Sequence, residues 1–194
     1  ATHGAPLGDE EIALTREALG WTHAPFEIPA DVYEAWQAIA KRGQAVRIAW
    51  ENRLTSHNDK AAFEASHGDV DAEALTAAVT EYRRQMSSDA PKVATRKASE
   101  MALEIVNGTL PNTVGGSADL TGSNNTRTSK MTPVSKENYG GDYLHYGVRE
   151  FAMAAVMNGI ALHGGFKPYG GTFLAFADYC RGAIRLSALM GVPA

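Results

Sequence analysis

Hydrophobic residues recur at helical spacing through most of the first half of the chain. The pattern predicts helices over residues 9–19, 30–54 and 71–86, each followed by a break. The apolar residues on or near one face of the second helix are Val32, Trp36, Ile39, Val46 and Trp50. Because this region is polar and has no Gly-rich turns, we interpret it as a segment that connects two domains.

The pattern changes after Pro91, where short apolar runs alternate with helical periodicity. The segments predicted there are, in order, a helix at 93–106, a strand at 112–117, a polar loop at 121–142, a strand at Tyr143, a helix from Glu150, a strand near 167–173 and a helix at 176–190. Strands that alternate with helices imply a parallel sheet with right-handed crossovers. The predicted fold class is therefore α/β, with a parallel sheet flanked by helices and a helical linker before it.

Two details of this second region stay open. The polar loop at 121–142 is long for a compact domain, so it is either functional or disordered. Gly191 is expected to cap the last helix, and Val192-Pro193 is expected to lead into a further strand.

Composition and charge narrow the class of protein. Hydrophobic residues make up 44% of the 194 residues and charged residues 21%, as in ordinary soluble globular proteins. The formal net charge of −4 argues against a surface for nucleic acid, and no apolar run approaches the roughly 18 residues of a transmembrane helix. Cys180 is the only cysteine, which excludes an internal disulfide and a zinc site built on cysteine pairs and fits a reducing cytoplasm. Residues 1–6 show no signal peptide.

A carboxylate and a row of aromatic residues are the first candidates for chemistry. Glu150 lies in the segment HYGVREFAM at residues 145–153, where a helix is predicted to begin. A carboxylate suits the dipole at that position whether or not it has a catalytic role. Phe173, Phe176 and Tyr179 recur every third residue, and they form either part of the core or one wall of a pocket.

Three further segments carry polar candidates. Asp119 and Ser123 lie in the run GGSADLTGSN, which either serves a ligand or forms a turn or helix cap. Arg96 lies at the start of a predicted helix, against the dipole preference for anions, so it is either exposed surface or a ligand for an anion such as phosphate. His3, in the run HGAPLG, lies beside the terminus, where a frayed end is the usual state.

The segments at 145–153 and 167–179 together resemble transketolase, a thiamine-diphosphate enzyme. The resemblance extends over the whole chain, which matches a middle part of that enzyme. It implies that residues 1–90 are the tail of the diphosphate-binding domain followed by a helical linker. It implies that residues 91–194 are the pyrimidine-binding domain, which has the thiamine-diphosphate-binding fold and is incomplete at its C-terminus.

The resemblance also implies roles around the cofactor. Glu150 is implied to be the catalytic glutamate, which holds a proton at the aminopyrimidine ring. Phe173 is implied to be the ring that stacks on the aminopyrimidine, with Phe176 and Tyr179 beside it. Asp119 is expected to lie near the thiamine.

For the substrate, the resemblance implies that Arg96 and Ser123 bind the phosphate of the sugar. His3 is implied to be a catalytic residue of the diphosphate-binding domain that also binds the substrate hydroxyls. Gly122 replaces a proline that is usual in the family, which loosens the loop around Ser123.

The implied activity is transfer of a two-carbon ketol unit from a ketose phosphate to an aldose phosphate through a thiamine-diphosphate ylid, as in the pentose phosphate pathway. The implied cofactors are thiamine diphosphate and a divalent metal, magnesium or calcium. Because the chain contains no Gly-Asp-Gly motif, the metal is expected to bind residues outside it. The implied partners are sugar phosphates and a second transketolase subunit in a homodimer. Since the cofactor lies between two subunits in this family, the segment alone is expected to be inactive.

Two other functions remain open. Dihydroxyacetone synthase shares this architecture but uses formaldehyde as the acceptor. Deoxyxylulose-phosphate synthase is disfavoured, because Arg96 and the segment 119–123 are more similar to transketolase. A non-catalytic module with a pyrimidine-domain fold belongs to a different class. The missing metal motif supports such a module, whereas the joint presence of the cofactor and substrate residues argues against it.

Overall fold

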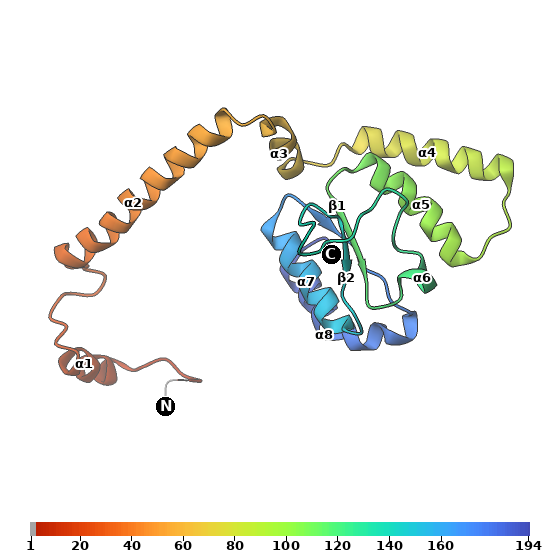
Figure 1. Cartoon of the computed structure of the whole chain (residues 1–194). Coiled ribbons are helices and arrows are strands. Elements are labelled where there is room, and N and C mark those ends of the chain that lie inside the picture. The colour runs from red at the N-terminus through yellow and green to blue at the C-terminus, as the bar shows by residue number, and fades with distance from the viewer. Residues whose placement is uncertain (1–2) are drawn as a thin grey trace. The chain divides into compact units, whose positions relative to one another are not determined.

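The computed structural model describes residues 3–194. They form two compact units, whose boundary lies between Asn58 and Asp59. Figure 1 shows the described residues of unit 1, 3–58, in red to orange, and unit 2, the residues from Asp59, in olive to blue.

Unit 1 consists of two helices joined by an irregular segment. Helix α1 spans Asp9–Ala18, opens with acidic residues that suit its dipole, and is followed by Gly20 at a φ of +64°. Helix α2 spans Ala30–Thr55. Both helices confirm the sequence prediction to within one residue at either end. None of the described residues of unit 1 is buried, and Trp36 on α2 is 69% exposed.

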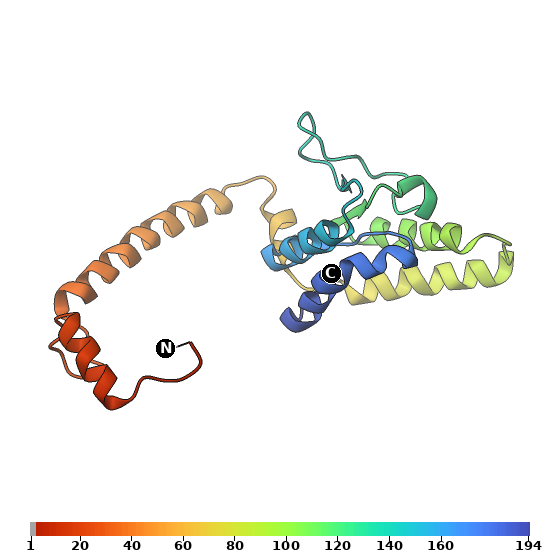
Figure 2. The ribbon, with the colours of Figure 1, turned by 90° about the horizontal axis from the view of Figure 1, so that it is seen from below.

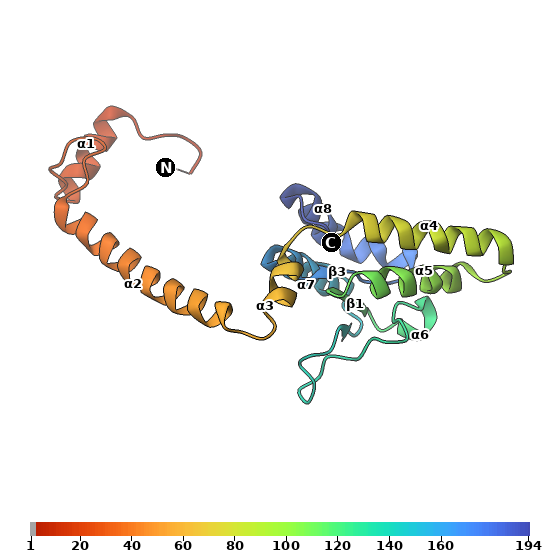
Figure 3. The same cartoon turned by 90° about the horizontal axis from the view of Figure 1, so that it is seen from above.

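Three helices open unit 2. Helix α3 spans Lys60–His67, α4 spans Ala72–Asp89 and α5 spans Thr95–Thr109. The carboxylate of Asp71 caps α4 by accepting a hydrogen bond from Ala74 N at 2.9 Å. Helices α4 and α5 lie side by side (Figure 3). The last helix of the predicted linker, α4, therefore packs against α5.

Helix α3 has no counterpart among the predicted elements. Its one large apolar side chain is Phe63, so no hydrophobic periodicity marks it in the sequence. Long-range hydrogen bonds tie its end to the sheet, because Asn112 Nδ2 donates to Ser66 O at 3.1 Å and to Gly165 O at 3.0 Å.

The sheet has three parallel strands in the order β2-β1-β3. They are β1 (Thr113–Ser117), β2 (Tyr143–His145) and β3 (Lys167–Pro168). This sheet and the helices around it confirm the predicted α/β class. Strand β3 is shorter than predicted, because the glycines at 170–171 have no side chains to continue the pleated face. Hydrogen bonds continue beyond it, since Tyr169 N donates to Val114 O at 2.9 Å.

Helices α7 (Glu150–His163) and α8 (Ala177–Met190) complete unit 2, with a short 3₁₀ turn, η1 (Leu174–Phe176), before α8. Both helices begin within one residue of the predicted positions. Gly191 closes α8 at a φ of +65°, as predicted. Helices α7 and α8 pack against each other (Figure 1). The buried core at this contact consists of Met153 and Ala154 of α7, Cys180 and Ala183 of α8, and Ala118.

The long polar loop is held in place by hydrogen bonds to α5. It begins with a one-turn helix, α6 (Thr121–Asn124), and then extends away from the helices of unit 2 before it returns to β2 (Figure 2). The carboxylate of Glu104 accepts from Ser129 N at 2.6 Å and from Ser129 Oγ at 3.0 Å. Asn107, about one turn further along α5, donates to Thr128 Oγ1 at 3.3 Å. A polar stripe on α5 therefore orders a loop that the sequence alone left open.

Candidate active site

Three segments leave the sheet at one edge. Ser117, the last residue of β1, pairs with His145, the last residue of β2, and forms a bridge with Gly171 in the segment after β3. The carboxyl ends of all three strands therefore lie at the same edge. Open α/β sheets bind ligands in the crevice outside the carboxyl ends of their strands.

Glu150 follows β2 and is the first residue of α7. It is 9% exposed, and its carboxylate has no hydrogen-bond or ion-pair partner among residues 3–194. Burial raises the pKa of the Cys180 thiol, and the negative charge of Glu150 raises it further. Since Cys180 Sγ also donates to Glu150 O at 3.3 Å, the first turns of α7 and α8 are in contact at this point. The site therefore contains an unpaired carboxylate, carried by a largely buried residue, in the first turn of a helix.

A row of aromatic rings follows β3. The ring centroids of Phe173 and Phe176 are 5.9 Å apart and nearly parallel, and those of Phe176 and Tyr179 are 6.3 Å apart. The exposed fractions of the three residues are 42%, 36% and 65%, so the rings form part of the surface of unit 2 rather than its core. Just before them, the hydroxyl of Thr172 is buried without a hydrogen-bond partner among the described residues. The arrangement offers flat apolar surface beside an unused polar atom.

Gly171 in this segment is required by close packing. A Cβ built on it would lie 2.3 Å from the methyl group of Thr126 and 3.0 Å from Asn124 Nδ2. The glycine therefore allows the segment after β3 to approach the loop after β1. Only glycine permits this close approach, because it has no Cβ.

Asp119 and Ser123 lie in the loop that follows β1. Asp119 is exposed and has a φ of +62°, a left-handed backbone conformation that is uncommon for residues other than glycine. Ser123 lies within α6 and is partly buried, and Ser123 N donates to Leu120 O at 2.9 Å. Gly122 has open space around its Cα, and its neighbours form one helical turn in spite of the missing proline. The strained backbone of Asp119 is the kind of feature that concentrates at functional sites.

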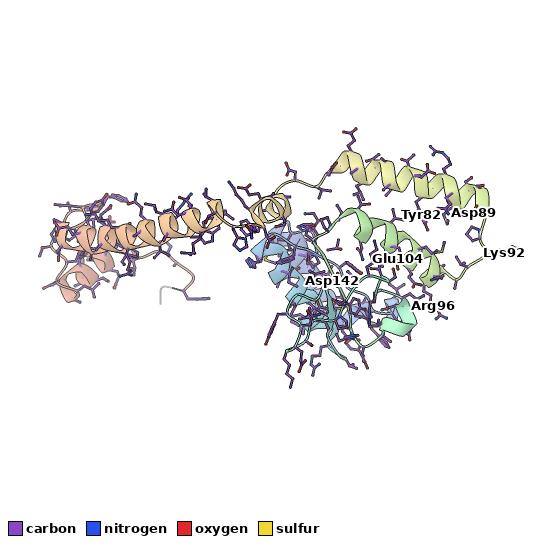
Figure 4. All side chains as sticks on the ribbon, turned by 45° about the horizontal axis from the view of Figure 1, so that its top comes forward. Tyr82, Asp89, Lys92, Arg96, Glu104 and Asp142 are labelled. Atoms are coloured by element: carbon purple, nitrogen blue, oxygen red, sulfur yellow. The ribbon has the colours of Figure 1, made fainter. Side chains whose placement is uncertain are left out.

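Arg96 is the second residue of α5 and is exposed. Figure 4 shows it at the end of α5 that lies beside α6, with Glu104 further along the same helix. Lys97 pairs with Glu100 at 2.8 Å, whereas Arg96 has no ion pair among the described residues. The guanidinium is thus available to an external anion.

His3 lies in unit 1 and is exposed. The other candidates all belong to unit 2. Among the described residues, no group of three or more histidine, cysteine, aspartate or glutamate side chains could hold a metal ion.

A buried hydrogen-bond network below the site was not found by reasoning from the sequence. The hydroxyl of Tyr143, a residue that is 0% exposed, lies 2.7 Å from Thr126 Oγ1 and 2.9 Å from Thr121 Oγ1. Asn124 Nδ2 donates to Ser117 Oγ at 3.2 Å. The one signal in the sequence was the density of serine, threonine and asparagine in this loop, which does not identify partners.

Two family models match the chain. One, described as the pyrimidine binding domain of transketolase, matches residues 91–194. The other, described as the thiamine diphosphate binding domain of transketolase, matches residues 1–77.

The chain belongs to the transketolase family. The cofactor of the matched domains is thiamine diphosphate. The resemblance stated from the two motif segments is thereby confirmed.

Individual transketolases are similar over nearly the whole chain. The transketolase of Cereibacter sphaeroides is 63% identical over 191 residues, which cover 98% of this chain and 29% of that protein. Transketolase 1 of Escherichia coli K12 is 46% identical over 195 residues, with 97% and 29% covered. This chain therefore spans less than a third of the length of these relatives.

Solved transketolase structures share the fold. A crystal structure of the Pichia stipitis transketolase superposes with a TM-score of 0.80 at 32% identity and covers 97% of this chain and 29% of that chain. The transketolase of Campylobacter jejuni gives a TM-score of 0.76 at 29% identity and covers 97% of this chain and 28% of that one. In the described part of this transketolase-family chain, no helix is long and apolar enough to cross a membrane.

Proposed function

We propose that this chain is the part of a ketol transferase that binds the pyrimidine half of thiamine diphosphate. The whole enzyme transfers a two-carbon ketol unit from a ketose phosphate to an aldose phosphate. The observation that carries the proposal is the unpaired carboxylate of Glu150, a residue that is 9% exposed and begins a helix at the same sheet edge as the exposed aromatic row. The family assignment agrees with it. By the same proposal, residues 1–90 are the tail of the diphosphate-binding domain and a linker, and residues 91–194 are the pyrimidine-binding domain.

The residues present fit thiamine diphosphate. A flat heteroaromatic ring needs apolar surface to stack on, and Phe173, Phe176 and Tyr179 offer exposed ring faces. A polar ring needs hydrogen-bond partners, and the Thr172 hydroxyl and the Glu150 carboxylate are both unpaired. In the proposal the three rings hold the aminopyrimidine, with Phe173 as the stacking ring.

The catalytic role of Glu150 follows from its position. When bound, the cofactor supplies a nucleophilic carbon that can add to a carbonyl group. Glu150 holds a proton at the nitrogen of the aminopyrimidine ring, because no other group of the described residues pairs with its carboxylate. Asp119, in its strained conformation, lies in the loop proposed to flank the thiamine.

The substrate phosphate is proposed to bind Arg96 and Ser123. Arg96 has no ion pair within the described residues, and a guanidinium suits phosphate because it donates two parallel hydrogen bonds. The Pichia stipitis transketolase was crystallised with fructose 6-phosphate, a ketose phosphate. His3 is proposed to bind the substrate hydroxyls and to take part in catalysis as a member of the diphosphate-binding domain.

The proposal also includes a metal site and a partner subunit that do not belong to this chain. A divalent metal, magnesium or calcium, is proposed to bind residues elsewhere in the protein. A second subunit is proposed to complete a homodimer. The exposed apolar residues of α7 and α8 that support such a partner include Phe151, Val156, Ile184, Leu186 and Leu189. The whole enzyme is proposed to act in the pentose phosphate pathway. It is proposed to be cytoplasmic, which agrees with a chain whose single cysteine can form no internal disulfide.

The test uses the full-length product of the gene that encodes this chain. Titration with thiamine diphosphate and Mg²⁺ should show saturable binding, and ketol transfer should require both the cofactor and an aldose phosphate. Efficient transfer to formaldehyde in place of the aldose phosphate would instead indicate a dihydroxyacetone synthase. Failure of a folded dimer to bind thiamine diphosphate would overturn the enzyme assignment in favour of a non-catalytic module.

A further inference from the structure

The two proposed phosphate ligands lie on different elements, and some contact must fix their separation. Arg96 belongs to α5, a helix of 15 residues, whereas Ser123 belongs to α6, a single turn of 4 residues. A helix this short has too few internal hydrogen bonds to be stable by itself. The distance between Arg96 and Ser123 therefore depends on the contacts that hold α6 to α5.

Glu100 provides that contact. Asn125 Nδ2 donates to Glu100 Oε2 at 3.0 Å, and Glu100 lies one helical turn after Arg96 on α5. Asn125 is the residue that ends α6: it has a φ of 55°, and its backbone N donates to Thr121 O at 3.0 Å. The hydrogen bond thus joins the end of the helix that carries Ser123 to the helix that carries Arg96.

The charges around Glu100 leave Arg96 free. Lys97 Nζ pairs with the same oxygen, Glu100 Oε2, at 2.8 Å, and the Glu100 side chain is only 23% exposed. A carboxylate held by two donors keeps one orientation better than an exposed one. Because Lys97 satisfies Glu100, the guanidinium of Arg96 is not drawn into an ion pair on its own helix.

A second anchor, on the residue next to Asn125, holds α6 to the sheet. Asn124 Nδ2 donates to Ser117 Oγ at 3.2 Å, and Ser117, at the end of β1, is 0% exposed. This bond ties α6 to the sheet and not to α5. Loss of the Glu100 contact is therefore expected to shift α6 relative to Arg96 without releasing it from the sheet.

We propose that Glu100 is a positioning residue for substrate phosphate: through Asn125 it holds Ser123 at the distance from Arg96 at which both bind one phosphate group. This inference rests on the proposed function, because it takes Arg96 and Ser123 as the phosphate ligands. Glu100 itself touches neither the phosphate nor the reacting atoms.

The test compares two donors in the full-length holoenzyme, a ketose phosphate and the same ketose without phosphate. Glu100→Ala removes the acceptor for Asn125, and the loss of one hydrogen bond corresponds to about a 3- to 10-fold rise in KM for the phosphorylated donor. The kcat for that donor and the kcat/KM for the unphosphorylated donor should not change. Glu100→Gln keeps an acceptor oxygen and should restore most of the affinity.

A second variant distinguishes the loss of this hydrogen bond from misfolding of the Glu100 variant. Asn125→Gly removes the same hydrogen bond from the other side, and glycine tolerates the left-handed backbone at this position. It should reproduce the selective rise in KM. An unchanged KM in both variants, or an equal loss for the two donors, would overturn the positioning role.

The variant Arg96→Ala tests the assignment of the phosphate ligands separately from the positioning role of Glu100. It should abolish the preference for the phosphorylated donor if the ligand assignment is right. If Arg96→Ala leaves that preference intact while the wild type transfers ketol units, the phosphate ligands are wrongly assigned and the role of Glu100 fails with them. If the wild type transfers no ketol unit, the proposed function itself fails, and so does the inference.

Discussion

At the scale of the residue, the site depends on side chains and glycines with narrow requirements. Glu150 lies shortly after β2 and is the first residue of α7. Both positions could be predicted, because Gly147 ends the short apolar run and a clear helical period begins at Glu150. The partner of Glu100 could not be predicted, because Asn125 is 25 residues away and nothing local indicates the pairing. The same holds for the hydroxyl network of Tyr143, which is defined only when the loop folds onto the sheet.

Two glycines near the site should respond in opposite ways to substitution. Gly122→Ala should raise the free energy of unfolding by about 0.4–1 kcal/mol, because the site is open and the unfolded chain loses freedom. Gly171→Ala should lower it by about 1–3 kcal/mol, because the new methyl group would lie 2.3 Å from that of Thr126. Denaturant titration of both variants checks the pair. A stabilising Gly171→Ala would contradict the close packing described.

At the scale of the element, hydrophobic periodicity and end signals predicted the long helices well. Helices α1, α2, α7 and α8 begin where acids, prolines and apolar spacing place them, and Gly20 and Gly191 close two of them. The short elements could not be predicted in this way. Helix α3 and the single turn of α6 are held by hydrogen bonds to distant segments, and β3 ends at two glycines whose role is close packing.

One buried amide contributes hydrogen bonds to the contact between α7 and α8. Asn158 is 5% exposed, and its Nδ2 donates to Ala183 O at 2.9 Å while its Oδ1 accepts from Ser187 Oγ at 2.5 Å. Asn158→Ala should lower the free energy of unfolding by about 1–3 kcal/mol, because buried partners lose their hydrogen bonds. Ser187→Ala, which leaves the bond to Ala183 intact, should cost less. Equal effects in chemical denaturation would show that the Ala183 bond contributes nothing.

Two tyrosines should make unit 2 sensitive to alkali. Burial raises the pKa of Tyr146 and of Tyr169 from 10.0 to about 12, so the folded chain favours the neutral phenols. The stability that they contribute is complete below pH 10 and is lost as the pH rises through about 12. Near-ultraviolet absorbance should show two of the 7 tyrosines ionising late in the folded state.

Tyr146→Phe provides the control for that titration. The hydroxyl of Tyr146 has no hydrogen-bond partner among the described residues, so its removal should cost little stability. One late-ionising group should disappear from the titration curve. If every tyrosine of the folded protein ionises together near pH 10, the burial of these two phenols is wrong.

At the scale of the whole molecule, the two units differ in how they can be stable. Unit 2 has a buried core, whereas no described residue of unit 1 is buried and most of its large apolar side chains are exposed. Helices gain most of their stability from packing of an apolar face. A peptide of residues 1–58 should therefore show weak, non-cooperative helicity by circular dichroism. A sharp thermal transition in that peptide would contradict this expectation.

Glu150 is proposed to control the proton on the aminopyrimidine ring of bound thiamine diphosphate. The most direct measurement is the rate of hydrogen–deuterium exchange at the thiazolium carbon of the cofactor in the full-length enzyme. Glu150→Gln keeps the shape of the side chain and should slow this exchange by about 100-fold or more, because the glutamine cannot hold the proton. The control is Glu137→Gln, which changes an exposed carboxylate on the polar loop and should leave the rate unaltered. If the exchange in Glu150→Gln is as fast as in the wild type while the cofactor remains bound, the role assigned to Glu150 is wrong.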